Sequence, residues 1–205
     1  MDLTMRKASP YVLIFEEPAP RGVELTVQDD GEVSGKIIGI NSTADHVTYP
    51  KICIVSLTSV AYVQVSCITS DEPYRPHPHK LFQNWENGNP EDFSRGVVNA
   101  QVRAHYPVAE LKDIKLQYIS REDVKKALGD RKSVPVNPFG NPEWSDAEIN
   151  GIDLNSVRLC FQVFIKNPNS GKLQAIVPVV SAPIYLKPPT PNVITPQDEI
   201  LDNGS

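Results

Sequence analysis

The stretch Val157-Arg-Leu-Cys-Phe-Gln-Val-Phe-Ile165 decides the fold class. Every second residue of it, from Val157 to Ile165, is apolar, and successive side chains of a β-strand point to opposite faces. The pattern therefore predicts a strand with one fully apolar face, as expected of a central strand in a sheet. Cys160 lies within this strand, so we interpret it as a small packed hydrophobic residue rather than as a nucleophile.

Shorter segments with strand-like composition surround this stretch. Prolines, 19 of 205 residues, and glycines separate them into short pieces, which is typical of all-β folds. The segments predict eight to ten strands, at residues 11–15, 23–27, 51–58, 63–67, 98–102, 114–118, 157–165, 173–180 and 183–186. We therefore expect an antiparallel β-sandwich of immunoglobulin type.

Two stretches depart from the strand pattern and predict short helices inserted between strands. Ser120 followed by Asp123 resembles a capping box that opens a helix through Leu128, with Gly129 at its end. Ser145 with Glu148 resembles a second cap.

Composition limits the classes of function. The chain has 40% hydrophobic residues and a net charge of −5, so it can fold, and its overall charge does not indicate a nucleic-acid partner. It has no apolar run long enough to span a membrane and no secretory signal, so we expect neither a membrane protein nor a secreted one. Three widely spaced cysteines predict neither a disulfide framework nor a metal site and favour a reducing compartment.

Motifs of enzyme or metal chemistry are weak. His77-Pro-His79 places two imidazoles two residues apart, but no third ligand stands at a suitable spacing, so a structural or surface role is favoured over metal binding. The sequence contains neither a GxSxG elbow nor a glycine-rich phosphate loop. We therefore predict no enzymatic activity, catalytic residue, cofactor, metal or small-molecule substrate.

A weak basic cluster is open to two interpretations. Seven cations fall between residues 112 and 132, interleaved with the acids Glu110, Asp113, Glu122, Asp123 and Asp130. The favoured interpretation is a solvated helix face with ion pairs one turn apart. The other is a face that contacts phosphates, formed by Lys112, Lys115, Arg121, Lys125, Lys126, Arg131 and Lys132.

Several segments together resemble the N-terminal half of the Rel homology region, the DNA-binding part of the Dorsal and nuclear factor kappa-B family. They occur in the family's order and extend over residues 10–186. The segments are Pro10-Tyr-Val-Leu-Ile-Phe-Glu-Glu-Pro18 followed by Arg21-Gly22, Ser70-Asp-Glu-Pro-Tyr-Arg-Pro-His-Pro-His-Lys-Leu81, Asn137-Pro-Phe139, Asp153-Leu-Asn-Ser-Val-Arg-Leu-Cys-Phe-Gln-Val-Phe164, and Ser181-Ala-Pro-Ile-Tyr185.

The resemblance implies an immunoglobulin-like DNA-binding domain at residues 10–186 of a dimeric transcription factor, acting in immune or developmental signalling. We expect disorder at residues 1–9 and in the proline-rich acidic tail 187–205. The implied partners are κB-type double-stranded DNA, other Rel-family chains and an ankyrin-type inhibitor. The implied location is the cytoplasm, the nucleus or both. The sequence ends where the family's dimerisation domain would begin, and it lacks the basic import segment found beyond that domain.

The family's recognition loop reads Arg-Phe-Arg-Tyr-x-Cys-Glu-x-Arg, and its counterpart here is Glu24-Leu-Thr-Val-Gln-Asp-Asp-Gly-Glu32. Three family arginines become Glu24, Thr26 and Glu32, and only Asp30 keeps the acidic character of the family glutamate. Val27 replaces the tyrosine, and Asp29 replaces the cysteine. By family position the DNA-binding residues are Arg21, Glu24, Thr26, Asp30, Glu32 and Arg121, and candidate phosphate contacts are Lys36, Lys125 and Lys126.

The charge of this loop leaves two hypotheses. The family loop carries three arginines and one glutamate, or +2, whereas residues 24–32 carry four carboxylates, or −4. Each lost bidentate arginine–guanine pair removes about 1–3 kcal/mol of discrimination. The favoured hypothesis is a transcription-related Rel domain with weak or absent κB binding of its own. The alternative is a Rel-derived interaction or decoy module that does not bind DNA.

Overall fold

The computed structural model describes residues 8–83, 95–134, 137–167 and 170–189. Within them the chain forms thirteen strands, and every strand ladder is antiparallel. The strands are β1 (Tyr11–Glu16), β2 (Thr26–Val27), β3 (Val33–Lys36), β4 (Lys51–Val55), β5 (Val60–Ile68), β6 (Lys80–Gln83), β7 (Val97–Arg103), β8 (Val108–Glu110), β9 (Ile114–Tyr118), β10 (Ser156–Lys166), β11 (Leu173–Ala175), β12 (Val179–Val180) and β13 (Ile184–Tyr185).

Strand β10 lies at the centre, as its alternating apolar residues predicted. One edge pairs with β5 over eight consecutive positions, and β5 pairs in turn with β7. The other edge of β10 pairs with β11, β12 and β13. Cys160 is 1% exposed, which confirms that it is a packed residue of the strand.

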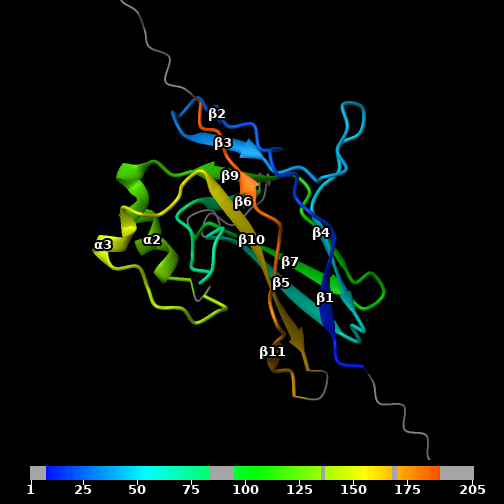
Figure 1. Cartoon of the computed structure of the whole chain (residues 1–205). Coiled ribbons are helices and arrows are strands. Elements are labelled where there is room, and N and C mark those ends of the chain that lie inside the picture. The colour runs from blue at the N-terminus through cyan, green and yellow to red at the C-terminus, as the bar shows by residue number, and fades with distance from the viewer. Residues whose placement is uncertain (1–7, 84–94, 135–136, 168–169, 190–205) are drawn as a thin grey trace, which may run out of the picture.

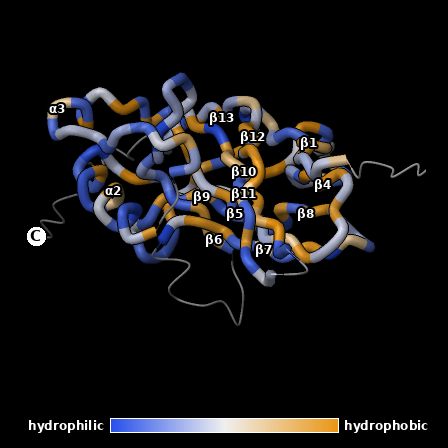
Figure 2. The backbone as a smooth tube through the Cα atoms, turned by 90° about the horizontal axis from the view of Figure 1, so that it is seen from below, coloured by the Kyte–Doolittle hydropathy of each residue, from blue (hydrophilic) through white to orange (hydrophobic). Residues whose placement is uncertain are grey.

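Three sheets share one hydrophobic core. Their strand orders are β1-β4-β8, β11-β10-β5-β7 and β2-β3-β9-β6. Inner residues from all three sheets, among them Ile52, Phe161 and Leu116, belong to a single cluster. Figure 1 shows the three sheets against one another, and Figure 2 shows hydrophobic stretches running through the central strands. The expected immunoglobulin-like sandwich with short helical insertions is thus confirmed.

The sequence pattern missed three short strands, β3, β6 and β8. Strand β3 reads Val33-Ser-Gly-Lys36, and serine and glycine have weak strand propensity. Gly35 is required there because a Cβ at this position would lie 2.4 Å from the backbone oxygen of Glu24. Tertiary packing, rather than local propensity, therefore forms this strand.

The helical insertions form a compact group beside the sheets (Figure 1). A 3-10 turn (Arg121–Asp123) leads into α2 (Val124–Lys132), and α3 (Asp146–Ile149) follows later in the chain. The prediction that Gly129 ends the helix is wrong: α2 continues to Lys132, because Leu128 and Arg131 are buried on its inner face and hold the last turn.

The two predicted caps differ. Ser145 and Glu148 form a complete capping box at α3, as predicted. The Ser120 hydroxyl donates instead to the Asp123 carboxylate at 2.9 Å, and it caps no backbone N–H. No helix in the described part of the chain is both long and apolar enough to cross a membrane.

The segments 1–9 and 187–205, expected to be disordered, fall largely outside the described residues, which begin at residue 8 and end at residue 189. Within the described part, Lys187 forms an isolated parallel bridge with Glu24. This bridge joins the end of the described chain to the segment that corresponds to the recognition loop.

Candidate nucleic-acid interface

The segment corresponding to the recognition loop folds as a β-hairpin, which we call the acidic hairpin (residues 24–36). Strands β2 and β3 pair with Thr26 opposite Ser34 and Val27 opposite Val33. The tip is closed by its own backbone, because the Gln28 N–H donates to the Glu32 carbonyl at 2.7 Å. Gly31 adopts a φ of 83°, a left-handed conformation that glycine accepts without strain. The hairpin backbone is therefore defined by local hydrogen bonds.

Sheet pairing brings the tip of the acidic hairpin close to the second predicted DNA-binding segment. Strand β3 pairs with β9 so that Val33 stands opposite Tyr118. The chain leaves β9 at this end and reaches Arg121 three residues later. Two segments about ninety residues apart in sequence thus meet at one end of the β2-β3-β9-β6 sheet.

Four of the predicted site residues line one concavity. Its volume is about 550 Å³, and it lies over the outer face of β2 and β3. The four residues are Arg21, Glu24, Thr26 and Lys36, and the lining also includes Gln28, Ser34 and Lys115. The structure therefore places an acid, a hydroxyl and two predicted cations on one surface.

The cations of this concavity are only partly available. The Lys36 Nζ lies 3.2 Å from Asp113 Oδ1 in an ion pair whose side chains are both about half exposed. The Lys115 Nζ lies 5.9 Å from the centre of the Phe82 ring. Arg21 is exposed and forms no ion pair with any described residue. Within this concavity, Arg21 is thus the cation most accessible to a phosphate.

The carboxylates of the acidic hairpin face solvent. Glu24, Asp29, Asp30 and Glu32 are all exposed, and no lysine or arginine occurs from residue 24 to residue 35. The Asp30 carboxylate accepts the Glu32 N–H at 3.0 Å, which braces the tip. Val27, at the position of the family tyrosine, is 62% exposed.

Arg121 is held by the helical insertion. Its guanidinium donates to the carbonyls of Ile149, at 3.2 Å, and Ile152, at 2.7 Å. The first of these carbonyls belongs to the last turn of α3, where backbone acceptors lack helical partners. Arg121 therefore joins the segment after β9 to the end of α3.

The two remaining candidate phosphate contacts lie on α2. Lys125 pairs with Asp146 at 3.0 Å, and both side chains are largely exposed. Lys126 is exposed and has no ion pair with a described residue. Of the seven cations in the basic cluster, only Lys125 and Lys132 form ion pairs with described residues, and both pairs join α2 to the chain around α3. The predicted ion pairs one turn apart on a single helix are therefore not found among the described residues.

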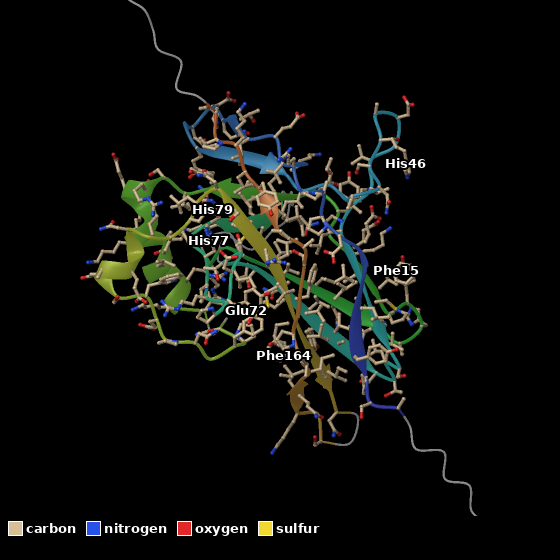
Figure 3. The ribbon with its side chains drawn as sticks, viewed as in Figure 1. Phe15, His46, Glu72, His77, His79 and Phe164 are labelled. Carbon is tan, nitrogen blue, oxygen red and sulfur yellow. The ribbon has the colours of Figure 1, made fainter. Side chains whose placement is uncertain are left out.

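His77 and His79 have structural roles. Both are 0% exposed, and Figure 3 shows them next to each other between the helices and β10. Each Nε2–H donates to a backbone carbonyl, of Asp153 at 2.9 Å and of Leu154 at 2.8 Å. The Nδ1 of His79 accepts the Ile119 N–H at 3.0 Å, and that of His77 accepts the His79 N–H at 3.2 Å. Both rings are thus neutral and committed to the backbone.

Burial sets the acid–base properties of this interior. Desolvation lowers the pKa of His77 to about 4 and that of His79 well below its ordinary value. It raises the pKa of the Cys160 thiol to about 12, which opposes thiolate chemistry. No group of three or more potential metal ligands occurs among the described residues.

The sequence placed Lys115 among the possible phosphate contacts of the basic cluster but did not connect it with the hairpin, whereas the structure places it in the lining of the concavity. It stands directly opposite Lys36 in the β3–β9 ladder. The alternation of residues 114–118 places Lys115 on the outer face, but β3 was not predicted, so its cross-strand neighbour could not be identified. Like charges directly opposite each other repel, and Asp113 offsets this pair.

Comparison with known proteins identifies the class. The family model of the Rel homology DNA-binding domain matches residues 12–187, so the chain belongs to the Rel homology DNA-binding domain family. This is a non-enzymatic family of transcription factor domains.

Relatives place it near the Dorsal and c-Rel proteins. The chain is 37% identical over 182 residues to the embryonic polarity protein dorsal of Drosophila melanogaster, covering 88% of this chain and 18% of that protein. It is 33% identical over 177 residues to the human proto-oncogene c-Rel, covering 86% of this chain and 28% of that protein. The chain thus spans less than a third of either relative.

A solved structure confirms the fold. A chain described as the Dorsal homologue Gambif1 bound to DNA matches with a TM-score of 0.75 and 34% identity. The match covers 86% of this chain and 99% of the other. The domain-sized fold of that DNA complex is therefore present here.

Proposed function

We propose that this chain is the DNA-binding domain of a Rel-type transcription regulator whose own affinity for κB DNA is weak or absent. The family assignment and the DNA-bound relative support the general role. The observation that carries the specific part is the acidic hairpin, with four exposed carboxylates and no cation from residue 24 to residue 35. The regulator acts in the nucleus, with κB-type duplex DNA as the partner of its class.

Electrostatics supports this proposal. A DNA duplex carries one negative charge per about 1.7 Å, and each phosphate neutralised by a cation adds about 0.9 to the salt slope of binding. Residues 24–35 of the hairpin offer no cation for such contacts, and the carboxylates of the hairpin repel the phosphates. Replacing two or three arginines removes roughly 2–9 kcal/mol of discrimination, comparable with the 4–10 kcal/mol that separates specific from non-specific binding.

The neighbouring cations do not restore a continuous basic surface. Lys36 is paired with Asp113, Lys125 with Asp146, and the Arg121 guanidinium with two backbone carbonyls. Among the predicted DNA contacts, only Arg21 and Lys126 are cations that form neither an ion pair with, nor a side-chain hydrogen bond to, a described residue. Such isolated exposed charges support weak, salt-sensitive association.

The backbone of the hairpin, by contrast, is compatible with restored recognition. Its tip is closed by main-chain hydrogen bonds that do not depend on the acidic side chains of Glu24 and Glu32. Substituting these exposed residues should leave the free energy of unfolding within about 0.5 kcal/mol of its original value. Gains in DNA affinity can therefore be measured without a change of fold.

The test is titration of a labelled κB duplex and a scrambled duplex at low salt and at about 150 mM salt, where phosphate contacts are strongly screened. We expect no sequence-selective binding by the original chain at the higher salt. The triple variant Glu24→Arg, Thr26→Arg, Glu32→Arg should bind the κB duplex more tightly, with a steeper salt slope by about 0.9 for each arginine that reaches a phosphate.

The matched control places lysine at the same three positions. It carries the same charge change but lacks the bidentate geometry with which arginine reads guanine. We expect it to gain salt-dependent affinity without the same preference for the κB duplex. Sub-micromolar, sequence-selective binding by the original chain at about 150 mM salt would contradict the proposal.

A further inference from the structure

The outer face of the β1-β4-β8 sheet is both apolar and exposed. On β1 the outward side chains are those of Tyr11, Leu13 and Phe15, all exposed, whereas the intervening Val12 is buried in the core. Figure 3 shows Phe15 at β1, on the side of the molecule opposite the helices. Single exposed apolar residues are ordinary, but a contiguous apolar patch marks a surface that meets a partner.

The strand registers extend this apolar surface across the whole sheet. Residues directly opposite each other in an antiparallel ladder share a face of the sheet. Tyr11 stands opposite Val55. Leu13 stands opposite Cys53, and Cys53 stands opposite Val108 on its other side. A central row of Leu13, Cys53 and Val108 therefore runs straight across the three strands.

The two ends of this face carry opposite charges. At one end Lys51 lies between Glu16, at 3.6 Å, and Glu110, at 3.3 Å, which leaves a net charge of −1. At the other end Tyr106, two residues before the start of β8, continues the outward alternation of the strand. Arg103 forms an antiparallel bridge with Tyr106, is exposed, and has no ion pair with a described residue. The face is therefore acidic at one end and basic at the other.

The size of the face suits a weak dimer. Tyr11, Phe15 and Tyr106 are between 50% and 72% exposed, so their side chains alone expose roughly 300–450 Å². Two such faces in contact, with their apolar neighbours, would bury about 1,000 Å² in total, the lower limit for a specific interface. Obligate dimers bury more than about 2,000 Å². The area therefore favours a reversible association over a permanent one.

We propose that this face packs against the same face of a second copy of the chain, with a two-fold axis along the central row. A flat sheet face is covered well by another sheet, as in a β-sandwich. The axis reverses the strand direction between the copies, so Tyr11 of one copy faces Phe15 of the other, and Leu13 faces Leu13. It also brings Arg103 of each copy to the acidic end of the other, which makes the charges complementary. This inference does not depend on how the acidic hairpin treats DNA.

Sedimentation velocity of the 205-residue chain at increasing concentration tests the proposal. At about 150 mM salt we expect the weight-average sedimentation coefficient to rise from that of a monomer toward that of a dimer. The rise should occur between about 5 µM and about 500 µM, as expected of an interface of this size. A chain that stays monomeric up to about 500 µM overturns the proposal and leaves the face to a different protein.

A matched pair of substitutions locates the contact. Leu13 is 46% exposed and Leu173 is 55% exposed, but Leu173 lies on β11 in another sheet. Leu13→Lys brings two lysines together at the two-fold axis, so dimerisation should weaken about tenfold or more. Leu173→Lys should leave dimerisation unchanged. Both variants should fold, because both side chains are exposed. Equal dimerisation of the two variants overturns the proposal.

Cys53 reports the position of the axis, because in this arrangement it faces Cys53 of the second copy. Of the three cysteines, all within the described residues, only Cys53 is not buried. Packed sheets lie about 10 Å apart, too far for a disulfide, so a short bismaleimide is used to link the two thiols. We expect a covalent dimer that is lost in Cys53→Ser and reduced in Leu13→Lys, at equal labelling of Cys53 by N-ethylmaleimide. No covalent dimer, or one equally abundant in Leu13→Lys, overturns the proposal.

Discussion

The acidic hairpin and the buried histidine pair are both rich in polar side chains, yet they use them in opposite ways. In the hairpin the main chain closes its own hydrogen bonds, and the acidic side chains project into solvent. At His77 and His79 the side chains complete the hydrogen bonds of the main chain, and neither residue is exposed. Substitutions in the hairpin should therefore change charge and recognition, whereas substitutions in the histidine pair should change folding.

The largest effect is expected at His79. His79→Ala removes a ring that accepts from the Ile119 N–H and donates to the Leu154 carbonyl, leaving two buried backbone groups unpaired beside a cavity. These losses together should cost about 5 kcal/mol of unfolding free energy. For a domain of this size the melting temperature should fall by about 10 °C or more, measured by circular dichroism.

A control for this substitution is His46→Ala, since His46 is exposed. It should leave the melting temperature nearly unchanged, because exposed substitutions alter stability by about 0.5 kcal/mol or less. If His79→Ala were equally neutral, the contrast between the buried histidine pair and the acidic hairpin would be lost.

Acid should destabilise the domain through the same pair. The unfolded histidines have a pKa of about 6.5, whereas the folded pKa is about 4 for His77 and well below 6.5 for His79. Between these values the unfolded chain binds more protons, so stability is complete above pH 6.5 and falls as the pH drops toward 4. The loss should reach about 2 kcal/mol at pH 5 for His77, and His79 should add to it in the same direction.

Urea denaturation at pH 7.5, 6 and 5 measures this dependence. This range lies mostly above the ordinary carboxylate pKa of about 4–4.5, so the histidines dominate it. A stability that stays constant from pH 7.5 to pH 5 would contradict the neutral, buried state of both rings.

The sequence predicted the β-sandwich and its buried residues better than the candidate nucleic-acid interface, for a physical reason. The alternation of Val157 to Ile165 records burial directly, so β10 and the sandwich could be inferred. His77 and His79 were correctly favoured as structural, but their backbone partners near residue 153 are distant in sequence. Gly129 was misread as a helix end, because the burial of Arg131 that extends α2 is a tertiary effect.

The candidate site was less predictable because long-range pairing forms it. The charges of residues 24–32 could be read from the sequence, but the neutralisation of Lys36 by Asp113 depends on the fold bringing together two residues seventy-seven positions apart. Likewise, nothing local to Arg121 indicates that Ile149 and Ile152 would accept its hydrogen bonds. A charge can be read from a sequence, whereas its availability to a ligand depends on the fold.

The smallest effect is expected at Arg121. Its family position predicts a contact with DNA, whereas its hydrogen bonds to the carbonyls of Ile149 and Ile152 indicate a structural role. Substitutions at Arg121 can therefore separate these two roles. Arg121→Lys keeps the charge but cannot reproduce both guanidinium contacts to the carbonyls of Ile149 and Ile152. If the structural role dominates, this variant should lose about 1–2 kcal/mol of unfolding free energy, measured in urea. The dependence of its DNA affinity on salt concentration should stay unchanged. Lys126→Ala is the matched control: Lys126 is exposed, so its removal should change stability by less than about 0.5 kcal/mol. Unchanged stability of Arg121→Lys, together with a salt slope lowered by about 1 in Arg121→Ala, would instead place this arginine on the phosphates.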